Sequence, residues 1–222
     1  MLNLGVLVSG NGTNLQSIID SIESGSLAAG IRVVISNRPD AYALERAKRH
    51  AIPFRIITNG EFPSREAFDA EAVRVLREAR VELVLLAGFM RILSPLFIRA
   101  FPLRIMNIHP SLLPAFRGLD VQRKAVEYGA KFSGCTVHFV DEGLDTGPII
   151  IQAALPLLDT DTAESLSRRI LEEEHRIYPQ AVQLFAEGRI RVEGRRVFVR
   201  DSAASGDSIE NPAAEIFNKG PG

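Results

Sequence analysis

The chain has 222 residues, of which 46% are hydrophobic and 24% are charged, and its formal net charge at pH 7 is −1. Its length and composition are those of an ordinary globular α/β protein, and no basic run predicts nucleic-acid binding. The apolar stretch at residues 1–8 is too short for a signal peptide, and no apolar run approaches the roughly 20 residues of a membrane span. The single cysteine, Cys135, excludes an internal disulfide and a cysteine-rich zinc site. We therefore expect a cytoplasmic protein without a metal.

The first half of the chain alternates between strand-like and helix-like segments. Strands are predicted at residues 2–9, 31–37, 53–59, 81–88 and 103–109. Helices are predicted at residues 14–25, 41–50, 64–80 and 94–101, the last with Ser94 as N-cap and Pro95 at its first position. Strands and helices that alternate at this spacing indicate βαβ units and a mostly parallel sheet. Right-handed crossovers bring the carboxyl ends of such strands to one edge, where ligands of open α/β sheets bind.

The second half follows a different pattern. Two long strand candidates, 131–143 and 147–157, are separated by a short turn and could pair antiparallel. Helices are predicted at 119–129 and 162–188, the second capped by Thr162 and kinked or broken at Pro179, with a hairpin at 189–200 that turns on Glu193 and Gly194. We expect one Rossmann-like domain over residues 1–200, a mostly parallel sheet flanked by helices with antiparallel C-terminal strands. Residues 201–222 are small, polar and contain glycine and proline, and we expect a weakly ordered tail there.

A glycine-containing loop, "SGNGTNL", joins the first strand to the first helix. Main-chain amides in such a loop, together with the start of a helix, form an anion site, to which Thr13 and Asn14 could add donors beside Gly12. The dinucleotide fingerprint does not fit, because Leu15 replaces its third glycine and Asn37 stands where an acidic residue is needed. The loop therefore predicts a small phosphate cradle, with a tight strand–helix turn as the structural alternative.

Two polar residues stand at the end of the fifth predicted strand, in "MNIHPSLLP". Asn107 and His109 are two positions apart, so both side chains point to the same side of the strand. Pro110 stops the strand and restricts His109 to extended geometry. A lone histidine at a strand end is more often a hydrogen-bonded structural residue, but an asparagine on the same face strengthens a functional interpretation.

A carboxylate in a glycine-flanked turn completes a candidate acyl-transfer site. Asp145 lies in "EGLDTG", although Asp141 and Glu142 compete with it. An amide or imidazolium can stabilise a developing oxyanion, and histidine can carry a proton near neutral pH. A carboxylate beside the histidine favours the charged ring. Because the only cysteine lies in a strand and no GxSxG elbow is present, direct transfer between two bound substrates is favoured over a covalent intermediate.

Four stretches together resemble the phosphoribosylglycinamide formyltransferase family over about residues 1–190: "GVLVSGNGTNLQSIID", "LAGFMRILSP", "NIHPSLLP" and "TVHFVDEGLDTGPIIIQ". The resemblance implies transfer of a formyl group from the co-substrate 10-formyltetrahydrofolate to the amine of glycinamide ribonucleotide, in de novo purine synthesis. It implies small-molecule substrates and no metal, nucleic acid or membrane, and it leaves a homodimer open.

The resemblance also implies the roles of individual residues. The catalytic positions of the family match Asn107, His109 and Asp145. The positions that bind the ribonucleotide phosphate and the glycinamide match Gly12, Thr13, Asn14 and Glu174. The folate-binding positions match Arg65, Met90, Arg91, Ile92, Leu93 and Asn107. From the residues alone, the segment 90–93 favours a loop packed into the core. His138 and His175 are interpreted as structural.

Two related activities are the alternatives. A methionyl-tRNA formyltransferase shares the pattern around His109 but needs a further C-terminal domain, for which we expect the tail to leave no room. A formyltetrahydrofolate hydrolase would be expected to carry an N-terminal regulatory domain, and this sequence begins at its first strand. A non-catalytic folate- or nucleotide-binding module would not need the Asn, His and Asp set. Where the family often has a lysine and histidines in the loop after "SLLP", this chain has Arg117 and Asp120, whose effect is left open.

Overall fold

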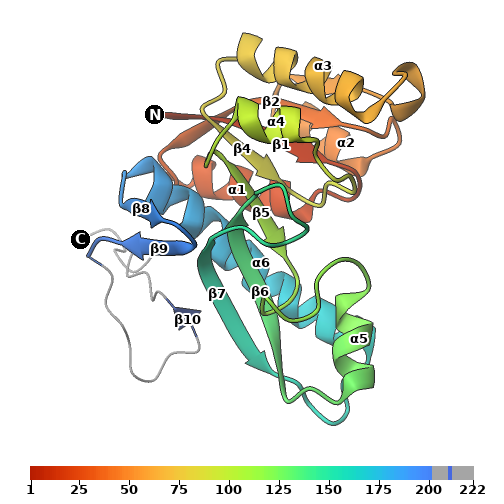
Figure 1. Ribbon diagram of the computed structural model, residues 1–222, viewed down its shortest axis with the longest axis vertical. Coiled ribbons are helices and arrows are strands. Elements are labelled where there is room, and N and C mark those ends of the chain that lie inside the picture. Colours follow the sequence, from red (N-terminus) through yellow and green to blue (C-terminus); the bar gives the residue numbers. More distant parts are fainter. Residues whose placement is uncertain (202–209, 212–222) are drawn as a thin grey trace. The chain divides into compact units, whose positions relative to one another are not determined.

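The computed structural model describes residues 1–201 and 210–211 (Figure 1). The chain divides into two compact units, one made of residues 1–107 with 139–142, the other of residues 108–138 with those from 143 onward. The tail predicted over 201–222 lies, apart from Asp201 and residues 210–211, outside the described residues. The assignment of residues 1–200 to one catalytic domain stays a prediction.

The first unit is built on parallel strands that hydrogen bond in the order β5-β4-β1-β2-β3 (Figure 1). The strands are β1 (Leu2–Val8), β2 (Ala29–Ser36), β3 (Phe54–Ile56), β4 (Leu83–Leu86) and β5 (Ile105–His109). The helices are α1 (Thr13–Glu23), α2 (Tyr42–Arg49), η1 (Asn59–Glu61), α3 (Arg65–Glu78) and α4 (Pro95–Ala100). The predicted βαβ pattern is confirmed, with β3 shorter than predicted.

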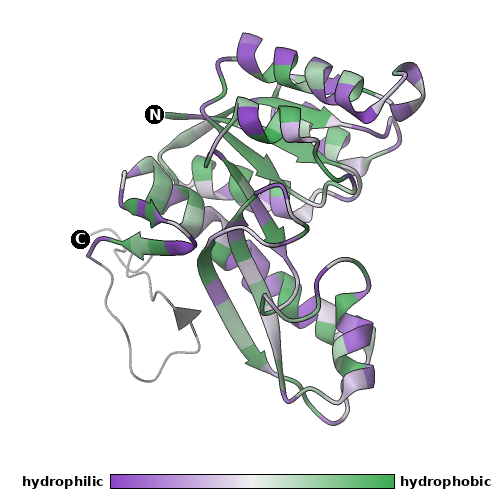
Figure 2. Ribbon diagram, in the orientation of Figure 1, coloured by the Kyte–Doolittle hydropathy of each residue, from purple (hydrophilic) through white to green (hydrophobic). Residues whose placement is uncertain are grey.

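Apolar faces of α3 and α4 cover one side of this sheet. Phe68 and Leu76 of α3 and Phe97 of α4 are almost fully buried against strand residues such as Leu7 and Ile35. Figure 2 shows β1, β2 and β4 as mostly green ribbons and α3 as a helix that alternates between green and purple. Burial of each large apolar side chain contributes about 1.5–3 kcal/mol, so this face holds the strand ends and their loops in place.

The second unit contains an antiparallel strand pair and a long helix. Its elements are α5 (Val121–Tyr128), β6 (Phe132–Phe139), β7 (Ile149–Pro156), α6 (Ala163–Ala186), β8 (Ile190–Glu193), β9 (Arg196–Val199) and β10 (Glu210–Asn211). β6 pairs antiparallel with β7, and β10 pairs antiparallel with the other side of β7. β8 and β9 form the predicted hairpin, with Gly194 in its turn at a φ of 59°. The fold class, a mostly parallel α/β sheet with helices and antiparallel C-terminal strands, is confirmed.

The long helix α6 differs from the prediction at Pro179. Thr162 caps it as expected, accepting from the Ser165 N–H while Ser165 reaches back to the Thr162 N–H. The sequence predicts a kink or a break: the break is wrong, because Pro179 lies inside one continuous helix, and the kink stays a prediction. Proline removes a single helical hydrogen bond, to His175. An uninterrupted buried stretch from Ile177 to Leu184 holds both halves of the helix in place.

Among the described residues, no helix is both long and apolar enough to cross a bilayer. The same residues contain no group of three or more His, Cys, Asp or Glu side chains arranged to hold a metal ion.

Candidate active site

The glycine loop after β1 turns directly into α1 at Gly12. Gly12 is the N-cap residue and has a φ of +70°, a left-handed conformation that L-residues disfavour. A Cβ at this position would lie 2.6 Å from Ala43 Cβ and 2.9 Å from Ala43 Cα. The Ala43 N–H also donates to the Gly10 carbonyl at 3.1 Å. The loop is therefore pressed against the first turn of α2, and glycine is required at position 12 for both reasons.

Ser9 joins three loops at the carboxyl ends of the parallel strands. Its hydroxyl donates to Asn37 Oδ1 at 2.6 Å, at the end of β2. The same oxygen accepts the Met90 N–H at 2.8 Å, after β4. Asn37, which stands where a dinucleotide-binding protein carries an acid, thus serves as a structural partner of the glycine loop. The phosphate-loop candidate and the folate-segment candidate are consequently held together at one edge of the sheet.

The segment from Met90 to Leu93 is only partly packed into the core. Leu93 is buried, whereas Met90 and Ile92 are 65% and 60% exposed. Its far end is held by Asp69, a fully buried residue of α3 whose carboxylate accepts the Ser94 N–H at 2.6 Å. The segment is anchored at both ends, and it presents exposed apolar side chains between the anchors. The segment therefore differs from the core-packed loop favoured from the residues alone, and its exposed apolar side chains suit contact with a flat ligand.

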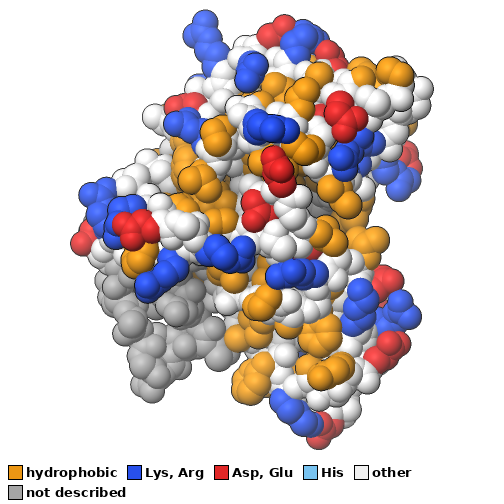
Figure 3. Space-filling model, in the orientation of Figure 1, with side chains coloured by type: hydrophobic (Ala, Val, Ile, Leu, Met, Phe, Trp, Pro, Cys, Tyr) orange, Lys and Arg blue, Asp and Glu red, His pale blue; other side chains and the backbone are white. Residues whose placement is uncertain are grey.

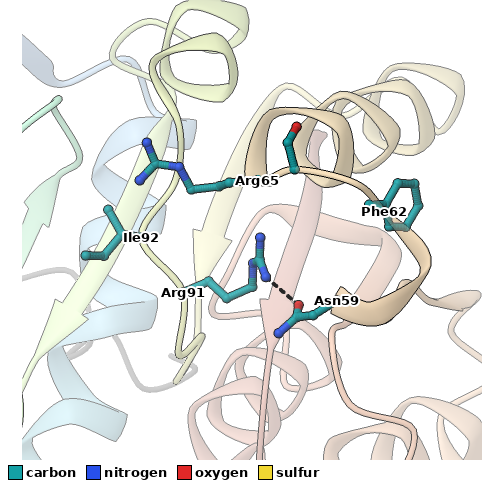
Figure 4. Close-up of a pocket in the computed structure, with 6 residues that line it drawn as sticks. Asn59, Phe62, Arg65, Arg91 and Ile92 are labelled. Carbon is teal, nitrogen blue, oxygen red and sulfur yellow. Dashed lines mark hydrogen bonds between the residues drawn. The ribbon is translucent and has the colours of Figure 1, made fainter.

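A pocket of about 450 Å³ adjoins this segment (Figure 4). Figure 4 shows Arg65 extending from the first turn of α3 and Arg91 hydrogen bonded to Asn59. Arg91 also stacks on Phe68, with Cζ 3.9 Å from the ring centroid. The pocket is lined by Asn59, Phe62, Ser64, Arg65, Arg91 and Ile92. Two guanidinium groups beside an aromatic ring make it suited to a carboxylate-bearing ligand, because arginine binds carboxylates through two parallel hydrogen bonds.

In the second unit, His109 and Asp145 are brought together. His109 Nδ1 lies 3.6 Å from Asp145 Oδ2, and both side chains are almost completely buried. On the other side of the ring, Nε2 lies 3.0 Å from the carbonyl oxygen of Phe116. A carbonyl can only accept, so the ring must donate at Nε2. The histidine is therefore fixed between a neutral acceptor and a carboxylate.

Asp145 is oriented by the backbone around it. Its φ of +51° is a left-handed conformation, and Oδ2 accepts the Gly118 N–H at 3.0 Å. Oδ1 lies 3.9 Å from Nε2 of His138, a buried residue on β6. Asp145 thus faces two histidines, and the structure selects it over the neighbouring acids as the partner of His109. The alternation on β6 indicated a structural His138 but carried no signal of its proximity to this carboxylate.

The loop after β5 holds the histidine in position. Asn107 and His109 lie two positions apart on β5, which places both on the same side of that strand. Beyond Pro110, the Ser111 carbonyl accepts from Thr136 Oγ1 at 2.7 Å. Thr136 Oγ1 in turn accepts the Leu113 N–H at 3.1 Å. This buried network fixes the return of the chain toward the carbonyl that binds His109 Nε2.

The remaining site residues show different degrees of enclosure. Glu174 is a buried carboxylate on α6. Thr13 is half-buried and Asn14 is buried at the start of α1. Arg117 is exposed, and Asp120 forms an ion pair with Arg123 at 3.0 Å at the start of α5. The two residues left open by the sequence therefore lie outside the His109–Asp145 pair.

The chain matches the formyl transferase family over residues 2–182. Phosphoribosylglycinamide formyltransferase from Escherichia coli is 43% identical over 191 residues, which cover 86% of this chain and 90% of that protein. The crystal structure of glycinamide ribonucleotide transformylase 1 from Symbiobacterium toebii is 56% identical with a TM-score of 0.88, covering 90% of this chain and 94% of the other.

A trifunctional purine biosynthetic protein from Drosophila pseudoobscura pseudoobscura is 52% identical over 190 residues, but the match covers only 14% of its length, against 85% of this chain. The chain spans most of the bacterial relatives and a small part of the insect one. The extent of the family match and the agreement in structure lead to one conclusion: this chain belongs to the formyl transferase family.

Proposed function

We propose that the protein transfers a formyl group from 10-formyltetrahydrofolate to the amine of glycinamide ribonucleotide in purine biosynthesis. The observation that carries the proposal is His109, held between the Asp145 carboxylate and the Phe116 carbonyl on the strand that also carries Asn107. The family membership and the names of the bacterial relatives support this substrate pair.

The proposed reaction is a direct transfer. The amine nitrogen of the acceptor forms a bond to the formyl carbon, and the bond from that carbon to the folate nitrogen breaks. Asn107 and the imidazolium of His109 stabilise the negative charge that develops on the formyl oxygen. Asp145 supports the charged ring and assists removal of the proton from the attacking amine. That proton ends on the departing folate nitrogen, so no redox partner or covalent enzyme intermediate is needed.

Binding of the ribonucleotide is assigned to the glycine loop of the first unit and to Glu174 on α6 of the second. Gly12, Thr13 and Asn14 hold the phosphate through the amides at the start of α1. Glu174 binds near the glycinamide amine, as a buried carboxylate suits a cationic or amine-bearing group.

The folate is assigned to the residues around the arginine pocket. Arg65 with Met90, Arg91, Ile92 and Leu93 binds the folate, and Asn107 is proposed to contact its formyl-bearing part. The two guanidinium groups and Phe62 fit a ligand that combines carboxylates with aromatic rings.

Small molecules are the proposed partners, with neither nucleic acid nor a membrane. Figure 3 shows Lys and Arg side chains dispersed among Asp and Glu over the visible face, a pattern that supports this choice. We further propose a cytoplasmic location, consistent with a reaction on soluble metabolites. A homodimer stays a prediction that sedimentation equilibrium would test.

One assay tests the proposed activity. Purified protein is mixed with a 10-formyl-dideazafolate donor, whose deformylation is followed by absorbance, with and without glycinamide ribonucleotide. We expect deformylation that depends on the acceptor. Donor breakdown without acceptor would instead indicate a hydrolase, and formylation of charged initiator tRNA would indicate the tRNA-directed activity.

The role of His109 is tested by His109→Ala. We expect the turnover number to fall by about 10²–10⁴-fold, the range typical of a positioned acid–base group. Circular dichroism should be unchanged, which separates lost chemistry from lost folding. Near-full turnover by the variant would contradict the proposed mechanism.

A further inference from the structure

Arg46 connects helix α2 to the glycine loop through its guanidinium group. Nε donates to the carbonyl oxygen of Asn11 at 2.9 Å, in the middle of the loop. Nη1 donates to Gln16 Oε1 at 3.1 Å, one turn into α1. One planar group therefore bonds both to the loop and to the helix that the loop begins, which fixes the angle between them.

Further contacts immobilise the Arg46 side chain. Its Cζ lies 5.1 Å from the centroid of the Tyr42 ring, and its Cδ lies 3.5 Å from the position that a Cβ of Gly12 would occupy. Gln16, its hydrogen-bond acceptor, is itself held, because Nε2 donates to Asp20 Oδ1 at 2.8 Å and lies 3.1 Å from His50 Nε2. The guanidinium is consequently fixed by contacts on three sides, and the side chain is only half exposed.

The charge of Arg46 is not neutralised by a neighbouring acid. Across residues 1–201 and 210–211, no carboxylate forms an ion pair with it, and Nη2 has no hydrogen-bond partner. Arg74 and Arg176, by contrast, are each paired with glutamates. A rigid cation with spare donors beside a loop of main-chain amides is the arrangement that proteins use for phosphate.

Nearby cations on the same helix lack these contacts. Lys48 and Arg49 are exposed, and neither donates a hydrogen bond to the loop. Arg49 Cζ lies 5.5 Å from the same Tyr42 ring, so it shares the aromatic contact of Arg46 and differs from it in the bond to Asn11. The helix thus provides its own matched control for charge and stacking.

We propose that Arg46 is a positioning residue for the phosphate of the acceptor: it fixes the loop from Gly10 to Asn14 through Asn11 and gives this site its preference for a phosphorylated substrate. The inference deepens the proposed function and rests on it, since the phosphate is that of the ribonucleotide. It adds a residue of α2 to a binding site otherwise built from β1, α1 and their connecting loop.

The test compares Arg46→Met, Arg46→Lys and Arg49→Met with wild type, using glycinamide ribonucleotide and the corresponding ribonucleoside without phosphate as acceptors. We expect Arg46→Met to raise the KM for the ribonucleotide about tenfold, because the loop loses the charge-assisted hydrogen bond from Arg46 to Asn11 that fixes it. The KM for the ribonucleoside, the KM for the folate donor and kcat should each change by less than about twofold, because the phosphate is the group affected.

The two other variants define what the effect depends on. Arg46→Lys should have an intermediate KM, because an ammonium keeps the charge but cannot reach Asn11 and Gln16 with a planar fork. Arg49→Met should match wild type. An equal rise in KM for both acceptors in Arg46→Met, or a comparable effect in Arg49→Met, would overturn the proposal.

Calorimetric titration of each variant with the ribonucleotide, in the absence of donor, separates this inference from the proposed reaction. A wild type that binds the ribonucleotide tenfold more tightly than Arg46→Met but transfers no formyl group would refute the reaction and support the role of Arg46. A wild type that does not bind the ribonucleotide would overturn both.

Discussion

Replacement of Gly12 by alanine perturbs the glycine loop in two ways that the structure separates. The residue has a φ of +70°, and a left-handed conformation costs an L-residue about 1–2 kcal/mol. The added Cβ would also lie 2.6 Å and 2.9 Å from Ala43 Cβ and Cα, so the first turn of α2 must move. Overpacking of this kind costs about 1–3 kcal/mol. The sum is a loss of about 2–5 kcal/mol in the free energy of unfolding.

Gly10→Ala is the matched control in the same loop. A Cβ at Gly10 meets no atom within 4 Å, and its φ lies outside the left-handed region. Gly10→Ala should therefore change the free energy of unfolding by no more than about 1 kcal/mol, the range of a surface glycine substitution. Both variants remove a glycine from the loop, so general changes in the unfolded chain cancel between them.

Urea unfolding followed by circular dichroism measures the difference. With a slope m of about 2 kcal/mol/M, Gly12→Ala should lower the midpoint by about 1–2.5 M and leave m unchanged. The Gly10→Ala midpoint should stay within about 0.5 M of wild type. Equal midpoints for the two variants would refute the close packing of Gly12 against α2. A Gly12 variant is consequently a poor probe of phosphate binding, since it acts on stability first.

Three further predictions concern other parts of the molecule. Asp145→Asn keeps a side chain that tolerates the left-handed backbone but removes the charge facing His109, so kcat should fall about 10²-fold or more. Asp120→Asn, at a similar φ of 57°, is the control and should leave kcat unchanged. Equal kcat values for the two variants would contradict the proposed role of Asp145. Burial raises the pKa of the Cys135 thiol, so a disulfide reagent at pH 8 should modify it only in denaturant. Labelling of the native protein would contradict this prediction and show that β6 opens. Asp69→Ala removes the acceptor of the Ser94 N–H, so it should raise the KM for the folate donor several-fold and leave the KM for the ribonucleotide unchanged. An unchanged donor KM in steady-state kinetics would contradict the idea that Asp69 anchors the segment 90–93.

Much of the fold could be predicted because the pattern is local. Apolar runs such as 83–86 mark strands covered on both faces, and Ser94 with Pro95 marks the start of α4. The helix through Pro179 could not be predicted in the same way. Its continuity depends on the buried surface around the proline, which offsets the loss of about 3 kcal/mol that proline causes in a helix interior.

The candidate site shows a similar division. Gly12 and the His109 strand end were visible in the sequence, since glycine and proline report backbone requirements directly. Arg46 was not, because it is one of several cations on a short helix and only its contacts distinguish it from Lys48 and Arg49. Arg65, Arg91 and Ile92 of the arginine pocket were named through the family resemblance. Asn59 and Phe62, which also line it, carried no signal, because they approach Arg91 only in the folded chain.

The strand end alone does not build the His109–Asp145 pair. β5 places the ring, but its two nitrogens take their partners from elsewhere: the Phe116 carbonyl from the loop that returns after Pro110, and Asp145 from the turn before β7. Nε2 donates to the Phe116 carbonyl, and Nδ1 faces the Asp145 carboxylate at 3.6 Å, so each ring nitrogen lies beside an oxygen atom from a different segment. Under the proposed mechanism, the turn that holds Asp145 is therefore as necessary to the geometry of the site as the strand that carries the histidine.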